Sequence, residues 1–402
     1  MKTFEIDFNF EEPFELECGK ILPSLALRAT IYGQLNADKS NAILVFHALT
    51  GSSKIADWWS DLIGDGKILD TSQFAFVCVN YIGSCYGSTG ADSFLFLGKN
   101  NKKEFAPVTV RDIVRSQNFL LDYLGIERFQ TIIGGSVGGM CALQMAVDFP
   151  EIADHFIVIG ATPLSAFGLA LNHIQRKALD SSNDVQIARQ IATLSYKSSE
   201  IFNERFARKP NRNGENPREN YESRFDVAGY LDYQGEIFTK RFCADSYRVI
   251  TKAMDLFDLS DEEIQKIKAK ITLVGISSDW LFPAKDVEDL AKSFAANGVK
   301  TDYIEFVSPD GHDAFLSDTA QMSEILRRTL KENSEVKIQD STFQKNYERK
   351  NCEQKTTELF VGRKNRDCYG RITRNRTRHR DPLGRSGRER RRQLFASRNG
   401  SQ

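Results

Sequence analysis

The chain lacks several features that would place it in a specialised class of protein. It has no apolar run approaching the ~20 residues of a membrane-spanning helix, and Glu5 and Asp7 interrupt the apolar start, so we expect no secretory signal. Its seven cysteines form no Cys-x-x-Cys pair, and its five histidines include no His-Glu-x-x-His motif. The sequence therefore predicts a cytoplasmic protein with free thiols, no membrane association and no metal.

Net charge is also absent, because 54 Lys and Arg residues balance 54 Asp and Glu residues. The balance hides a division: residues 341–402 carry 18 basic and 6 acidic side chains, whereas residues 1–340 carry 36 basic and 48 acidic ones. We expect residues 333–402 to form a basic, disordered tail. A nucleic-acid-binding arm and an end translated in the wrong reading frame are the alternative interpretations.

Short apolar runs alternate with segments of helical periodicity through most of the chain. A helix is predicted over 110–124, and it begins in a capping box formed by Thr109 and Asp112. Buried strands are predicted at 42–46, 74–80, 129–133, 156–159, 271–276 and 303–306. This alternation predicts an α/β fold, with a mostly parallel sheet and helices on both faces.

Strand signals stop after residue 161 and resume near residue 270. The intervening segment has helical and polar stretches only, and an insertion of this size in an α/β sheet usually covers the ends of the strands. We therefore predict a core of residues 1–161 and 270–332, with residues 162–269 inserted as a helical lid.

One motif indicates the chemistry. Gly134-x-Ser136-x-Gly138 follows an apolar strand and precedes a helix-prone run, which is the nucleophile-elbow pattern of the α/β-hydrolase fold. The flanking glycines are expected because a Cβ at either position would clash in so sharp a turn. The same glycines do not fit a phosphate-binding loop, since no Lys-Ser or Lys-Thr follows the last of them.

A nucleophilic serine needs a basic histidine and an acid that orients this histidine. In α/β-hydrolases the chain order is serine, acid, histidine. Asp279 follows the strand predicted at 271–276, and His312 lies in the turn after the last predicted strand. We predict Ser136, Asp279 and His312 as a catalytic triad. The alternative interpretation of Asp279 is an ordinary turn or helix N-cap residue.

An oxyanion hole for acyl transfer needs two backbone N–H groups. We predict the amide of Val137, directly after the serine, and the amide of Leu49, in the loop that follows the strand at 42–46. His47 begins the same loop but precedes the serine, so we interpret it as shaping the loop.

Taken together, these segments resemble the homoserine O-acetyltransferase family of α/β-hydrolase-fold acyltransferases. The motifs agree with the family in order and spacing from about residue 40 to residue 330. They are His47-Ala48-Leu49-Thr50-Gly51, Asp57-Trp58-Trp59, Gly83–Gly90, Val108–Asp112, Gly135–Met140, Tyr230–Gly235, Arg241–Tyr247, Ser278–Pro283 and Gly311–Leu316.

The resemblance implies a ping-pong reaction of methionine biosynthesis, in which Ser136 takes an acetyl group from acetyl-CoA and passes it to L-homoserine. It implies no bound cofactor and a homodimer formed through the lid helices. It also implies that Asp313 binds the amine of the amino acid. Tyr196 and Lys197 stand where the family has a substrate-binding Tyr-Arg pair, although lysine cannot form the bidentate fork of arginine.

Other functions stay open at this point. The same fold could use a succinyl donor or a serine acceptor, and a lid would equally suit a carboxylic-ester hydrolase. A nucleic-acid-associated protein with an inactive core is a further alternative, which the ordered triad disfavours. A covered site favours transfer, because the acyl-serine must react with an alcohol in competition with water.

Overall fold

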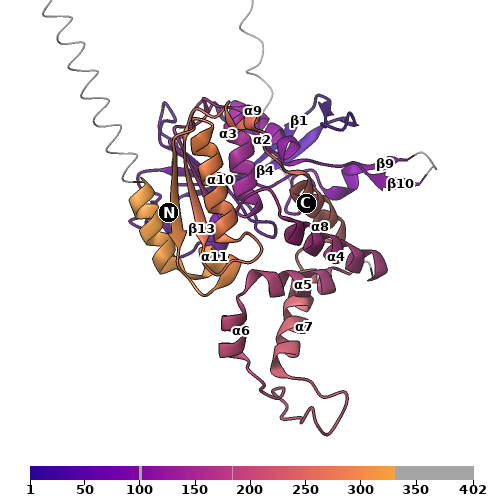
Figure 1. Cartoon of the computed structure of the whole chain (residues 1–402). Coiled ribbons are helices and arrows are strands. Elements are labelled where there is room, and N and C mark those ends of the chain that lie inside the picture. Colours follow the sequence, from indigo (N-terminus) through magenta and orange to yellow (C-terminus); the bar gives the residue numbers. More distant parts are fainter. Residues whose placement is uncertain (99–101, 183, 331–402) are drawn as a thin grey trace, which may run out of the picture. The chain divides into compact units, whose positions relative to one another are not determined.

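The computed structural model describes residues 1–98, 102–182 and 184–330 (Figure 1). An eight-stranded sheet lies at its centre, in the order β1-β4-β8-β5-β11-β12-β13-β14. The strands are β1 (Thr3–Phe10), β4 (Leu25–Tyr32), β5 (Ala42–Phe46), β8 (Ala75–Val79), β11 (Thr131–Gly135), β12 (His155–Ile159), β13 (Lys270–Ile276) and β14 (Thr301–Phe306). From β8 to β14 the neighbours pair in parallel, and β1 and β4 add an antiparallel edge. The mostly parallel sheet predicted from the sequence is thus confirmed.

Three two-stranded sheets and several short helices fill the connections. These elements are β2 (Phe14–Glu15) with β3 (Ile21–Leu22), β6 (Ile63–Gly64) with β7 (Leu69–Asp70), β9 (Leu95–Leu97) with β10 (Lys103–Phe105), α1 (Ile55–Trp58), η1 (Ala91–Phe94), η2 (Gly311–Asp313) and α11 (Ala314–Ser317). None of the short sheets extends the central one, so they do not alter the edge at which the parallel strands end.

Helices cover both faces of the central sheet, as predicted. Successive residues of a strand point to opposite faces, so Ile132 packs in one apolar cluster and Ile133 in another. The first cluster includes residues of α2 (Val110–Leu124), α3 (Val137–Asp148) and α10 (Ala284–Ala296). The second includes α1 and the helical residues 319–330. Central strands are therefore buried on both faces, and β5 and β8 are apolar at every position rather than at alternate ones.

The helix α2 begins and ends where the sequence predicts. The Thr109 hydroxyl accepts a hydrogen bond from the Asp112 amide, and the Asp112 carboxylate accepts one from the Thr109 amide. This capping box satisfies two amide groups that have no partner inside the helix. The helix ends at Gly125, whose left-handed backbone (φ 63°) is a common helix terminator.

Between β12 and β13 the described residues form helices and no named strand. The helices are α4 (Ala166–Ser182), α5 (Val185–Tyr196), α6 (Ser199–Arg205), α7 (Asp226–Thr239), α8 (Ala244–Leu256) and α9 (Asp261–Ile264). In Figure 1, α6 and α7 extend away from the sheet. We call residues 160–269 the helical insertion; its action as a lid stays a prediction. The tail predicted at 333–402 lies outside the described residues. None of the helices described is long and apolar enough to span a membrane.

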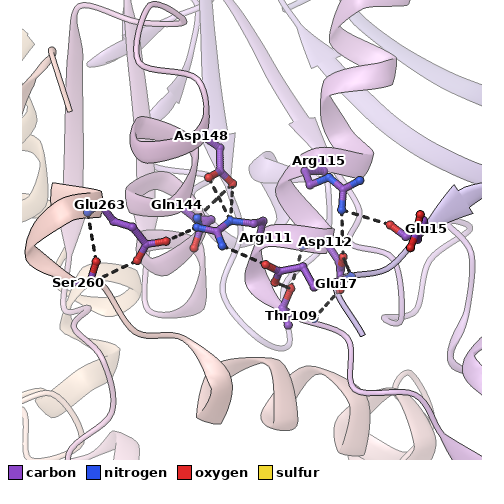
Figure 2. A network of polar contacts seen from close by, with 10 residues as sticks. All are labelled: Glu15, Glu17, Thr109, Arg111, Asp112, Arg115, Gln144, Asp148, Ser260 and Glu263. Atoms are coloured by element: carbon purple, nitrogen blue, oxygen red, sulfur yellow. Dashed lines mark hydrogen bonds and ion pairs between the residues drawn. The ribbon is translucent and has the colours of Figure 1, made fainter. Parts of the chain in front are cut away.

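Arg111 of α2 joins four segments of the chain (Figure 2). Its guanidinium forms ion pairs with Glu17 at 3.0 Å, with Asp148 at the end of α3 at 3.1 Å, and with Glu263 of α9. The Arg111 side chain is 29% exposed, so solvent screens these pairs only partly. The contact with Glu263 ties the end of the helical insertion to the core.

Replacing Arg111 with alanine is expected to lower the free energy of unfolding by about 1–3 kcal/mol, because three carboxylates lose their shared partner. The matched control is Arg327→Ala, which breaks one exposed pair with Glu324 and should cost less than about 1 kcal/mol. Urea denaturation followed by circular dichroism measures both. Equal losses in the two variants would contradict a central role for Arg111.

Candidate active site

Ser136 lies in the sharp turn between β11 and α3. Its backbone has φ 59° and ψ −130°, a conformation rarely adopted by a residue with a side chain. The surrounding structure holds it there: the Ser136 amide donates to the Ile159 carbonyl at 2.9 Å, and the Ser136 carbonyl accepts from the amides of Gly139 and Met140. The predicted elbow is therefore present at the carboxyl edge of the sheet.

The glycines around Ser136 are required by close backbone contacts. A Cβ built on Gly134 would lie 2.1 Å from the Gly138 carbonyl oxygen. A Cβ on Gly138 would lie 2.4 Å from the Phe46 carbonyl oxygen and 2.8 Å from that of His47. The clash predicted from the sequence thus occurs at both flanking positions.

Asp279 and His312 form a direct pair. Asp279 Oδ2 lies 2.6 Å from His312 Nδ1, and both side chains are buried. The other carboxylate oxygen, Oδ1, accepts from the amides of Leu281 and Phe282, each at 2.9 Å. Asp279 is therefore both a turn residue and the partner of His312, so the two interpretations of its sequence position hold together. Because all these groups donate to it, the carboxylate is fixed in one orientation.

The imidazole of His312 is enclosed by aromatic rings. The ring centroids of Tyr196, Phe282 and Phe315 lie 5.2–5.7 Å from that of His312. Burial disfavours the charged imidazolium, but the carboxylates of Asp279 and Asp313 outweigh this effect and raise the pKa of His312. With Nδ1 donating to Asp279, the remaining nitrogen Nε2 has an unshared pair and can accept a proton.

Ser136 and the Asp279–His312 pair meet around Gly160. The Ser136 amide is bonded to Ile159, and a Cβ built on Gly160 would lie 3.4 Å from Asp279 Oδ2 and 3.5 Å from His312 Cε1. Within the described part of the chain, His312 Nε2 has no hydrogen-bond partner, so a bond from the Ser136 hydroxyl is not formed in this state. Catalytic hydrogen bonds commonly tighten only when substrate binds.

The two amides predicted for the oxyanion hole belong to segments that meet at the elbow. Val137 is the first residue of α3, and Leu49 lies in the loop that follows β5. Neither amide donates to any acceptor in the described ranges. Because Gly138 approaches the carbonyls of Phe46 and His47, the end of β5 and the start of α3 are in contact.

The loop that carries Leu49 is fixed through its carbonyl groups. The Tyr81 hydroxyl donates to the His47 carbonyl at 2.5 Å, and Arg241 donates to the Thr50 carbonyl at 2.7 Å. The His47 ring stacks on Tyr81 with centroids 3.8 Å apart, and burial lowers the pKa of His47 to about 4. His47 therefore stays neutral and shapes the loop. Sequence reasoning did not identify Tyr81 or Arg241 in this role, since no spacing pattern links them to the loop.

The three residues expected to bind substrate also lie beside His312. Tyr196 contacts the imidazole ring, and Lys197 Nζ lies 3.3 Å from Asp313 Oδ2. Trp280 donates its indole N–H to the Lys197 carbonyl at 3.2 Å. Gly311 has φ 70°, and a Cβ there would lie 2.7 Å from the Tyr196 carbonyl oxygen. The end of α5 thus packs directly against the loop that carries His312.

The described residues contain no group of three or more His, Cys, Asp or Glu side chains arranged to hold a metal ion.

Comparison with known proteins places the chain in a family. The family model of the alpha/beta hydrolase fold matches residues 41–319. A homoserine O-acetyltransferase of Moorella thermoacetica is 38% identical over 363 residues, which cover 81% of this chain and 95% of the relative. The chain belongs to the homoserine O-acetyltransferase family. The resemblance found in the sequence is thus confirmed, and so is the α/β-hydrolase fold.

The family includes relatives that differ in their named acyl donor. A homoserine O-succinyltransferase of Alkalilimnicola ehrlichii is 35% identical, covering 79% of this chain and 92% of the relative. The crystal structure of homoserine O-acetyltransferase from Bacillus anthracis has a TM-score of 0.72 at 20% identity, covering 82% of this chain and 97% of that one. At this identity the structural likeness concerns the fold alone.

Substitution of Gly138 by alanine is expected to lower the free energy of unfolding by about 1–3 kcal/mol or more, because its Cβ would collide with backbone carbonyls. The control is Gly229→Ala in α7, where a Cβ would meet nothing within 4 Å; that change should stabilise by about 0.4–1 kcal/mol. Thermal unfolding of both variants tests the difference. A Gly138→Ala protein as stable as the parent would show that the two backbones can separate.

Proposed function

We propose that this protein transfers an acetyl group from acetyl-CoA to the side-chain hydroxyl of L-homoserine, through an acyl-Ser136 intermediate. The observation that carries the proposal is the 2.6 Å pair of Asp279 and His312 beside the strained Ser136 turn. Membership of the homoserine O-acetyltransferase family supports the choice of substrates. The reaction is a step of methionine biosynthesis and needs no bound cofactor.

In the first half-reaction His312 Nε2 takes the proton of the Ser136 hydroxyl, and the serine oxygen attacks the thioester carbonyl. The amides of Leu49 and Val137 stabilise the resulting oxyanion. The carbon–sulfur bond then breaks, His312 returns its proton to the sulfur, and CoA leaves as a thiol. Asp279 keeps the imidazole in the tautomer that exposes Nε2 and stabilises its positive charge.

In the second half-reaction the homoserine hydroxyl gives its proton to His312 and attacks the acyl-serine carbonyl. Collapse of the oxyanion breaks the bond to Ser136, which regains a proton from His312. O-acetylhomoserine is then released, and the enzyme returns to its starting state. Every proton transfer in both halves uses the single nitrogen Nε2.

The pair of Lys197 and Asp313 suits an amino-acid acceptor. Their charged groups lie 3.3 Å apart and are about one quarter exposed. An α-amino acid carries one carboxylate and one ammonium group, so it can exchange one ion pair for two: carboxylate with Lys197 and ammonium with Asp313. Tyr196, whose ring lies beside the imidazole of His312, would position the bound amino acid. With these contacts the acceptor hydroxyl would lie on the side of His312.

Burial of the reacting groups supports transfer over hydrolysis. Ser136 is 5% exposed and His312 is 3% exposed. Water must be kept from the acyl-serine while the acceptor is held in place. The insertion packs on the His312 loop where Tyr196 meets Gly311, and we propose that it supplies this cover.

The acyl donor and the acceptor are tested with a panel of substrates. Purified protein is incubated with acetyl-CoA or succinyl-CoA, each with L-homoserine, L-serine or no acceptor, and both CoA release and the acylated amino acid are measured. We expect release that requires both acetyl-CoA and homoserine. A succinyl preference would assign the activity named for the relative of Alkalilimnicola ehrlichii. Acceptor-independent release would instead indicate an ester hydrolase.

Ser136→Ala is expected to lower kcat by ~10³-fold or more, because no other group can carry the acyl chain. In the parent protein, mass spectrometry after acetyl-CoA alone should find one acetyl group on the peptide that contains Ser136. The control is Ser84→Ala, which alters another buried serine and should leave the acetylation intact. Acetylation of the same peptide in the Ser136→Ala protein would contradict the assignment of Ser136 as the nucleophile.

The pH dependence of kcat/KM should reflect the raised pKa of His312. Only the neutral imidazole accepts a proton, so activity should fall as pH decreases through a pKa above the ordinary value of about 6.5. Asp313→Asn removes one cause of the rise and should move the acidic limb to lower pH. Asp310→Asn, which does not contribute to the shift, should leave the limb in place. An acidic limb below the ordinary value in the parent would contradict this electrostatic account.

Two further expectations from the sequence belong to this proposal. We place the reaction in the cytoplasm, where acyl-CoA donors and free amino acids are both found. We also propose a homodimer formed through the helices of the insertion. Size-exclusion chromatography with light scattering measures its mass directly, and a monomer at assay concentrations would remove the dimer from the proposal.

A further inference from the structure

Two cysteines from distant parts of the chain lie where two segments pack together. Cys85 lies in the glycine-rich loop after β8, and Cys243 is the N-cap residue of α8 in the insertion. Each thiol lies close enough to the other to influence its ionisation. Both are reduced in this structure.

Neighbouring contacts hold the two segments together. The rings of Tyr86 and Phe242, each next to one of the cysteines, meet edge-to-face with centroids 6.3 Å apart. Arg241 donates to the Tyr86 hydroxyl at 3.1 Å, and the Asn80 amide group donates to the Tyr86 carbonyl at 2.8 Å. The segments that carry Cys85 and Cys243 are therefore held side by side.

The two thiols differ in reactivity. Cys243 is exposed, and its sulfur accepts the Ser246 amide at 3.4 Å at the amino end of the 13-residue helix α8. Contacts with Cys85 and Ser246 lower the pKa of Cys243, against the effect of burial. The contact with Cys243 and burial raise the pKa of Cys85. Because Cys243 is the exposed thiol and caps a helix, it meets an oxidant first, and Cys85 can then attack the oxidised sulfur.

We propose that Cys85 and Cys243 form a reversible disulfide that links the glycine-rich loop to the insertion. The oxidant is a peroxide. The Cys243 thiolate attacks the peroxide oxygen, which breaks the O–O bond and leaves a sulfenic acid and hydroxide. The Cys85 sulfur then attacks the sulfenic sulfur, the S–O bond breaks, and a second hydroxide leaves. Two thiols lose two electrons and two protons, and hydrogen peroxide becomes two waters.

The disulfide requires the two sulfurs to approach each other. Sulfur atoms in a disulfide lie about 2.05 Å apart, so the side chains of Cys85 and Cys243 must move closer while the flanking contact of Tyr86 and Phe242 persists. Disulfides of reducing compartments are commonly transient and redox-sensing, which is the behaviour expected of an exposed, low-pKa thiol with a resolving partner.

The link acts close to the proposed oxyanion loop. Arg241, two residues before Cys243, donates to the Thr50 carbonyl in the loop that carries Leu49. Drawing Cys243 toward Cys85 shifts Arg241 and fixes the insertion to the core. We therefore expect the oxidised protein to turn over more slowly. This consequence for activity rests on the proposed function, whereas the disulfide itself does not.

The test uses the full chain and compares samples treated with hydrogen peroxide or dithiothreitol. After remaining thiols are alkylated, intact mass and tryptic peptides are measured. We expect one crosslinked peptide pair that joins Cys85 to Cys243, lighter by two hydrogens and restored by dithiothreitol. Cys85→Ser and Cys243→Ser should abolish it, whereas Cys18→Ser, at another exposed thiol, should form it normally. Oxidation of Cys243 to sulfinic or sulfonic acid with no crosslink would overturn the proposal.

A second readout separates this proposal from the proposed function. Acyl transfer is measured by the appearance of acylated amino acid, which does not depend on counting thiols. We expect peroxide to lower the rate at least severalfold in the parent and in Cys18→Ser, reversibly, and to leave Cys85→Ser little changed. A crosslink with no acyl transfer in the reduced protein would refute the proposed function alone. A crosslink with an unchanged rate would refute the effect on turnover.

Discussion

The helix α3 begins so close to the loop after β5 that the backbone of Gly138 lies against the carbonyls of Phe46 and His47. This contact brings the start of α3, with Val137, next to the loop that carries Leu49. It also forces the chain at Ser136 into a positive φ, which raises the hydroxyl above the carboxyl edge of the sheet. The remaining parts of the site are arranged around a turn that only glycine neighbours permit.

Much of this arrangement could be predicted from the sequence, because local signals and the global fold agree. The strand over 42–46 and the helix over 110–124 have the predicted bounds. The order of Ser136, Asp279 and His312 led to a pair that is hydrogen-bonded in the structure. These features depend on periodicity, capping and strand order, which a single sequence carries.

Other features depend on tertiary contacts and escaped prediction. The strand before the elbow was expected to end at residue 133, but Gly134 and Gly135 continue to pair with β12. The helix α7 contains Gly229 and Gly235, which have low helix propensity, and it forms because it packs against α5. Contacts such as Arg241 with the Thr50 carbonyl join residues with no shared sequence pattern, so the part of the site that fixes the oxyanion loop was missed.

The insertion is attached to the core at widely separated points. Glu263 pairs with Arg111 near its end, the Ser198 hydroxyl donates to the Pro309 carbonyl near its middle, and Arg241 reaches the Thr50 carbonyl between them. A swing of the whole insertion as a rigid flap would have to break all three attachments at once. Small molecules are therefore expected to enter and leave the proposed active site by rotation of individual side chains where the insertion meets the core. Their passage should then be sensitive to single substitutions at these positions.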